Sequence, residues 1–327
     1  MSVNKFNWIY LVLRLTGIFR IFNQISLIRR QHIVLCYHCI SELKFGLHIR
    51  YLKTQFNITS LNSLMSSLFE NKDSSINESN KPLLALTMDD CFKTDFLSAN
   101  KICQENEVNC TYFVPVYYME SKKTLWSYRL NHFLSNKKTP CRIIDFDNNE
   151  VILKGELDIK IFEEKWINFF LYNEIQTLEI DIVIDKFLSV NSFIENLDSV
   201  IAEDVIRLNR NNKYASFQSH TVTHPKLFLC SEQELEYEFG RSKEVISKLD
   251  VNEKQNVICY PYGSNIHIGN SYVKASNYYE YGVTLQSGVV TSQSNKMLIP
   301  RIGIYEHDTY QSIRVKIFFA QVRNLFK

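Results

Sequence analysis

The chain has 327 residues, of which 45% are hydrophobic and 13% aromatic, and its formal net charge is +2. This apolar content is enough for a large core, in one domain or two smaller ones, and it excludes a disordered or fibrous chain. A charge this close to neutral gives no indication of a nucleic-acid partner. The eight cysteines form no compact framework, which favours free, buried thiols in a reducing compartment.

The first thirty residues are apolar and basic. Arg14 and Arg20 interrupt the apolar run, and the uncharged stretch 6–13 is far shorter than the roughly 20 residues of a membrane-spanning helix. No small-residue cleavage site follows, so we do not expect a secretory signal peptide. Two interpretations stay open for residues 1–30: an amphipathic helix that contacts a membrane surface through residues 5–30, or an ordinary helix packed on the domain.

From residue 31 onward, short apolar strands alternate with helical stretches. Ser231 and Glu234 have capping-box spacing and open a helix with Leu235 and Phe239 on one face. This alternation predicts an α/β fold with a parallel sheet or barrel. The strands are expected at residues 32–38, 81–90, 110–116, 214–220, 256–263 and 281–286.

The stretch 122–209 does not follow this rhythm and is rich in acidic and aromatic residues. We expect it to form a largely helical insertion with a hairpin, within a barrel that spans residues 31–310. Trp126, Tyr128 and Trp166 in this insertion are candidates for stacking on sugar rings, although core packing is the more common use of such side chains. Residues 311–327 are expected to form a C-terminal helix.

Polar side chains occur where the expected strands end. His38, Asp89, Asp90, His220 and Tyr262 each lie at or just beyond the C-terminal end of a strand. In a parallel α/β barrel these ends meet on one face, where active sites are built. The sequence therefore predicts that residues far apart in the chain surround one pocket.

Two of these motifs carry ligand chemistry. His220 and His224 are four residues apart, so a helical turn would direct both rings to one side, as in a metal chelate. Asp89 and Asp90 would point to opposite faces of a strand, but a turn at the strand end would let one bind metal and the other accept a proton. Alone, the first motif also fits a chance histidine pair, and the second a solvated turn.

In this order, "TMDDC", "SHTVTHP" and "CYPYG" resemble the three core motifs of the NodB-like polysaccharide deacetylases. These are metal-dependent enzymes that remove acetyl groups from sugars. The resemblance covers roughly residues 33–306 and implies an irregular, TIM-like (β/α)-barrel of about seven parallel strands. The strand-end histidine in "VLCYHCI" is similar to that of the circularly permuted subgroup, in which the first strand supplies the catalytic acid.

The resemblance also implies a role for each motif residue. Asp90, His220 and His224 would bind a divalent metal, most often Zn²⁺. Asp89 would be the general base and His38 the general acid. The backbone N–H of Tyr262 would help to hold the oxyanion.

The chain departs from the family pattern at three positions. Cys91 stands where glycine is usual, Met88 where phenylalanine is usual, and Cys259 where an arginine often orients the base. Arg301 of "LIPRIG" is the candidate to replace that arginine. His307 is the other candidate acid, but no apolar strand precedes it.

The function implied is removal of N-acetyl groups from a surface polysaccharide or from a lipid-linked or nucleotide-linked glycan precursor. The expected partner is an acetylated carbohydrate. The expected location is cytoplasmic; if residues 1–30 contact a membrane, the protein would be peripheral on the inner face of a bacterial membrane. A catalytically impaired carbohydrate-binding relative and an amidase or deformylase with another substrate are the alternatives.

Overall fold

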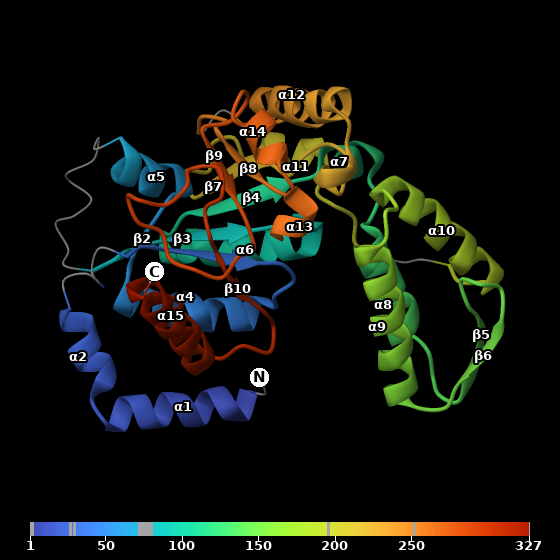
Figure 1. The fold of residues 1–327 in the computed structure, drawn as a ribbon, viewed down its shortest axis with the longest axis horizontal. Coiled ribbons are helices and arrows are strands. Elements are labelled where there is room, and N and C mark those ends of the chain that lie inside the picture. The colour runs from blue at the N-terminus through green and yellow to red at the C-terminus, as the bar shows by residue number, and fades with distance from the viewer. Residues whose placement is uncertain are drawn as a thin grey trace.

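The computed structural model describes residues 3–25, 28, 31–70, 81–194, 197–250 and 253–326. Within them, eight strands form one parallel sheet in the order β10-β1-β3-β4-β7-β8-β9, with β2 paired to β3 (Figure 1). The sheet curls, so the predicted TIM-like α/β barrel of about seven parallel strands is confirmed. The strands are β1 (Ile33–Tyr37), β2 (Asn57–Thr59), β3 (Leu83–Met88), β4 (Cys110–Val114), β7 (Ala215–Ser219), β8 (Val257–Cys259), β9 (Tyr281–Val283) and β10 (Ile302–Ile304).

Helices connect these strands and surround the sheet. The predicted capping box is present at the start of α12, where Ser231 and Glu234 exchange hydrogen bonds. The helices of this part are α1 (Val3–Leu15), α2 (Ile18–Gln24), α4 (Glu42–Gln55), α5 (Leu61–Phe69), α6 (Lys93–Asn106), α7 (Val116–Ser121), α11 (Glu203–Leu208), the 3₁₀ turn η2 (Leu227–Leu229), α12 (Glu232–Leu249), α13 (Asn265–Ile268), α14 (Ser271–Ala275) and α15 (Tyr310–Leu325).

The segment before β10 links the two edges of the sheet. The N–H of Ile299 donates to Gly282 O at 2.8 Å, and the N–H of Thr284 donates to Ile299 O at 2.9 Å. Two residues later the N–H of Arg301 donates to Gln286 O, and the chain then pairs with β1. Arg301 is thereby fixed on the inside of the barrel.

Strand alternation sorts the side chains into an outer and an inner layer. On β1 and β3, Ile33, Leu35, Leu84 and Leu86 pack outward in the core shared with the helices. Val34, Leu83 and Ala85 pack in a second core, inside the barrel. By the same alternation, Cys36 on β1, His38 just after β1 and Asp89 just after β3 also point to the inside of the barrel.

A second lobe lies beside the barrel and has a core of its own (Figure 1). It contains a hairpin and three helices, and aromatic side chains dominate its core. Trp166, one of the candidate sugar-stacking residues, is buried there. The elements are α8 (Trp126–Ser135), β5 (Cys141–Ile144), β6 (Glu150–Leu153), α9 (Glu156–Tyr172) and α10 (Thr177–Val190).

Candidate active site

The two aspartates of "TMDDC" face one pocket because the backbone turns between them. Asp89 keeps the inward direction of β3, and Asp90 adopts a left-handed conformation with φ of 62°. Both side chains are buried, and both line a pocket of about 530 Å³ at the C-terminal ends of the strands. His38, His220, His224 and Tyr262 line the same pocket.

Asp90, His220 and His224 bring three possible metal ligands together. Asp90 Oδ1 lies 3.5 Å from His220 Nε2 and 3.6 Å from His224 Nε2. Nδ1 of His220 lies 2.8 Å from the carbonyl oxygen of Cys259, so this nitrogen carries the proton and Nε2 keeps a free lone pair. Asp90 Oδ1 is buried and has no hydrogen-bond partner among the described residues. This donor set fits a divalent cation such as Zn²⁺.

The two histidines converge through a loop and not through the helical turn that their spacing suggested. Thr221 and His224 are left-handed, with φ of 66° and 52°, and the rings lie 4.7 Å apart between centroids. The buried carboxylate of Glu238 holds the loop by accepting from the N–H groups of Val222 and Thr223 at 2.7 and 3.0 Å. Glu238 is remote in sequence, and no local pattern identified it.

Next to this cluster, Arg301 binds Asp89 with two hydrogen bonds of 2.7 Å, one to each carboxylate oxygen. Both residues are buried. Burial alone raises the pKa of Asp89, but the charge and the hydrogen bonds of Arg301 outweigh it and hold that pKa well below its usual range. Asp89 is therefore ionised at neutral pH.

Two thiols also contact Asp89. Cys36 Sγ and Cys259 Sγ lie 3.3 and 3.4 Å from its Oδ2, and burial raises the pKa of both thiols. Each thiol is therefore protonated and can donate weakly to the carboxylate. The sequence reasoning did not assign a function to Cys36, although it lies two residues before His38 and so on the same side of the strand.

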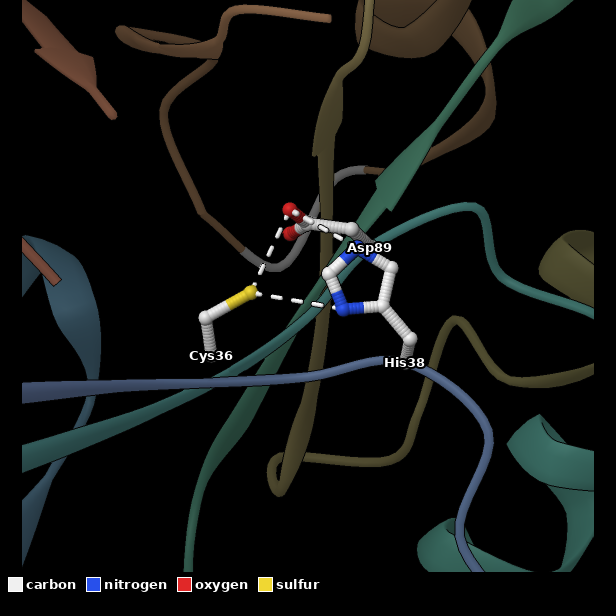
Figure 2. Close-up of side chains that lie close together, drawn as sticks. All are labelled: Cys36, His38 and Asp89. Carbon is white, nitrogen blue, oxygen red and sulfur yellow. Dashed lines mark hydrogen bonds and ion pairs between the residues drawn. The ribbon is translucent and has the colours of Figure 1, made fainter. Parts of the chain in front are cut away.

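His38 lies beside Asp89 at the end of β1 (Figure 2). Its Nε2 is 3.9 Å from Asp89 Oδ2, and its Nδ1 is 3.8 Å from Cys36 Sγ. The ring is partly exposed, in contrast to the aspartate. A group that delivers a proton to a leaving group needs such access to the pocket.

The third motif forms a tight loop at the end of β8. Tyr262 is left-handed, with φ of 60°, and Gly263 follows at 62°. A Cβ on Gly263 would lie 2.6 Å from Leu285 Cγ, so the close approach and the positive φ both require glycine. The hydroxyl of Tyr262 contacts Thr177 Oγ1 at 2.9 Å and accepts from Trp126 Nε1 at 3.2 Å. These contacts tie the loop to the second lobe.

Helices α8 and α9 of the second lobe form the outer wall of the pocket. On it, Asn131 Nδ2 donates to Glu163 Oε1 at 2.8 Å, and Tyr128 donates to Asp90 Oδ2 at 3.3 Å. Ile167 and Leu171 add an apolar strip. The wall therefore combines hydrogen-bonding groups with apolar surface.

Cys91, the Cys36–Cys39 pair and His307 do not belong to the proposed metal site. Cys91 has φ of 50° and packs in the outer core, and the described donor clusters that fit a metal do not include it. Cys36 and Cys39 have the spacing of a CxxC pair that the sequence reasoning overlooked, and both are free thiols. His307 is exposed and stacks on Tyr305 at 5.6 Å.

The pocket of this parallel barrel brings two histidines and an aspartate together as possible metal ligands, beside a second aspartate that is bound by an arginine. Residues 181–283 match the family model described as polysaccharide deacetylase. The match includes the second and third motifs, and the fold brings the first motif, which lies outside it, to the same pocket. Residues 181–283 are therefore similar to the polysaccharide deacetylases, a family of hydrolases, and the resemblance drawn from the motifs is confirmed.

Solved structures share the fold at low sequence identity. A putative polysaccharide deacetylase from Bacillus anthracis is 16% identical with a TM-score of 0.55, over 88% of this chain and 69% of that one. The Streptococcus pyogenes deacetylase PplD in complex with acetate is 15% identical with a TM-score of 0.53, over 88% and 98%. IcaB from Ammonifex degensii is 13% identical with a TM-score of 0.54, over 89% and 97%. A search of curated proteins found no match.

Proposed function

We propose that the protein removes N-acetyl groups from an acetylated carbohydrate, with a divalent metal, most often Zn²⁺, held by Asp90, His220 and His224. The observation that carries this proposal is the free, buried Asp90 Oδ1 facing the Nε2 atoms of two histidines. When bound, such an ion polarises a carbonyl and lowers the pKa of water. The match of residues 181–283 to the polysaccharide deacetylase family model and the solved deacetylases of the same fold support the reaction class.

The chain's own residues would divide the proton transfers between them. Asp89 is ionised and fixed by Arg301, so it is the candidate to accept the proton of the attacking water. Both oxygens of Asp89 accept hydrogen bonds from Arg301, so Asp89 is a weak base. It can accept a proton only from water whose pKa has been lowered. This requirement agrees with a cation held close to Asp89 by Asp90, His220 and His224.

His38 is the candidate to protonate the departing amine. It lies next to Asp89 and is open to the pocket, so it can exchange protons with solvent between turnovers. The backbone N–H of Tyr262 is the candidate oxyanion donor, since its loop lies at the same strand ends. The circularly permuted subgroup, on which the role of His38 was based, remains a prediction.

The substrate is proposed to be a sugar in a surface polysaccharide or in its lipid-linked or nucleotide-linked precursor. The mixed polar and apolar wall of α8 and α9 supports a sugar ring with hydroxyl groups near Asn131 and Glu163. An impaired, binding-only relative would not need the complete donor set or the Asp89–Arg301 pair. Both are present in this chain.

The test is acetate release from N-acetylglucosamine oligomers and from N-acetylated lipid- and nucleotide-linked sugars. We expect release with zinc present, its loss after chelation, and its return in proportion to added zinc up to one ion per chain. Zinc binding without acetate release from any of these sugars would instead identify a binding-only relative. Release from non-sugar amides alone would identify an amidase.

A further inference from the structure

Helices α1, α2 and α15 pack together on one side of the barrel (Figure 1). Phe19 contacts Phe318 edge-on at 5.5 Å between ring centroids, and Tyr10 contacts Tyr310 at 6.0 Å. Thr309 Oγ1 donates to Asn7 Oδ1 at 3.2 Å. The inner faces of α1 and α2 are therefore partnered by α15, whose own inner residues belong to the barrel core.

The outer faces of α1 and α2 are apolar and exposed. Trp8, Leu11, Val12 and Leu15 follow the i, i+3, i+4, i+7 spacing of one helical face, and Trp8 and Leu15 are 67% and 77% exposed. Ile21 on α2 continues this surface at 64% exposure. Burying these side chains against the barrel would stabilise the fold. Instead, the opposite side of each helix packs against α15.

The charge of these helices differs from that of the rest of the chain. Within their bounds, α1, α2 and α15 contain six Lys and Arg and no Asp or Glu, whereas the remaining residues contain 31 Lys and Arg against 35 Asp and Glu. Arg14, Arg20 and Arg323 are exposed among the described residues. Arg314 is buried and Lys316 pairs with Asp308, so the exposed charge comes from these three arginines. An apolar stripe flanked by exposed arginines is complementary to a surface that is apolar inside and anionic outside.

We propose that the outer face of α1 and α2 docks on an anionic lipid bilayer, with the helices parallel to its plane. None of the described helices is long and apolar enough to cross a bilayer, so docking at the interface is the mode that fits. Trp8, Leu11 and Leu15 enter the headgroup–acyl boundary, while Arg14 and Arg20 contact lipid phosphates. This inference does not depend on the proposed deacetylase activity.

Trp8 is an internal reporter of this docking. The chain has three tryptophans, and Trp126 and Trp166 are buried. We therefore expect vesicles of phosphatidylcholine with phosphatidylglycerol to shift the emission of the full chain to the blue, and Trp8→Phe to abolish the shift. Pure phosphatidylcholine vesicles should bind at least ten-fold more weakly, and high salt should weaken binding to the anionic vesicles.

A matched pair of variants tests which surface binds. Leu11→Asp with Leu15→Asp should reduce co-sedimentation with anionic vesicles at least ten-fold. Leu157→Asp with Ile161→Asp, at similarly exposed positions on α9, should bind as the unmodified chain does. Circular dichroism of both variants checks that they fold.

Three results would overturn the proposal: no binding to anionic vesicles, equal loss of binding in both double variants, or a chain dimer that Leu11→Asp with Leu15→Asp dissociates while vesicles do not bind. The last result would make this face a contact between two copies. Acetate release from a soluble oligosaccharide is measured on the same samples. A chain that binds vesicles but releases no acetate contradicts the proposed function alone.

Discussion

Asp89 is fixed by its neighbours more tightly than any other carboxylate in the pocket. Arg301 bridges both of its oxygens, and two thiols approach one of them. An arginine beside an inward aspartate was predicted from the "LIPRIG" motif, but two details were not. The bidentate geometry depends on how residues 299–301 cross to the far edge of the sheet, and the contribution of Cys36 depends on strand alternation.

The substitution of cysteine for the usual glycine at position 91 concerns the backbone conformation and not the chemistry of the site. The φ of 50° at Cys91 is a conformation that glycine adopts freely and other residues adopt at a cost of about 1 kcal/mol. The usual glycine of the family is therefore explained by the turn that redirects Asp90. Cys91 tolerates the same turn, and its buried side chain offsets the strain by packing in the core.

His32 couples the fold to pH. Its Nδ1 accepts the N–H of Leu83 at 3.0 Å, and burial lowers its pKa from 6.5 to about 4. Because the unfolded chain binds this proton more readily, stability is complete above pH 6.5 and decreases as the pH falls towards 4. At pH 5 the loss from this group is about 2 kcal/mol.

We expect His32→Asn, whose side-chain oxygen can accept the same N–H, to reduce the difference in unfolding free energy between pH 7 and pH 5. Urea titrations at both pH values measure it, with the exposed His307→Asn as the control. If both variants show the same pH dependence as the unmodified chain, His32 does not carry this linkage.

At the scale of elements, the turn between α9 and α10 holds the loop that carries His224. Thr177 Oγ1 donates to His224 O at 2.6 Å, and Lys226 N donates to Gln176 Oε1 at 3.1 Å. The buried ammonium of Lys226 donates to the carbonyl oxygens of Phe170 and Asn173 at the end of α9. The second lobe therefore positions a candidate metal ligand as well as covering the pocket.

Thr177→Val should weaken zinc binding about ten-fold, the range seen when groups that orient metal ligands are removed. It should also destabilise the fold by about 1–3 kcal/mol, because the carbonyl oxygen of His224 loses a buried hydrogen-bond donor. Competition with a chelating dye measures the affinity. Thr54→Val is the control, because Thr54 also donates to a carbonyl but is exposed, at the end of α4. Equal affinities in the two variants would show that the second lobe does not orient His224.

For the whole molecule, strand-end polarity predicted which residues meet, because parallel strands converge at one edge whatever connects them. It could not predict the path of the chain through the pocket. The i, i+4 histidines meet through a left-handed loop held by Glu238, and β2 and β10 were not among the predicted strands. The contacts of the second lobe with Tyr262 and His224 depend on tertiary packing, which no local pattern encodes.

The assembled molecule is a barrel with three specialised sides. One end carries the pocket, the second lobe closes it, and α1 and α2 present an apolar, cationic face elsewhere on the barrel (Figure 1).

The most direct test of the account is the pair of adjacent variants Asp89→Asn and Asp90→Asn, each assayed for bound zinc and for acetate release. The site predicts that Asp89→Asn keeps about one zinc per chain and loses acetate release at least a hundred-fold, the low end for loss of a general base. Asp90→Asn should lose both. If Asp89→Asn loses the metal, or if it releases acetate at the unmodified rate, the division of roles between the two aspartates is wrong.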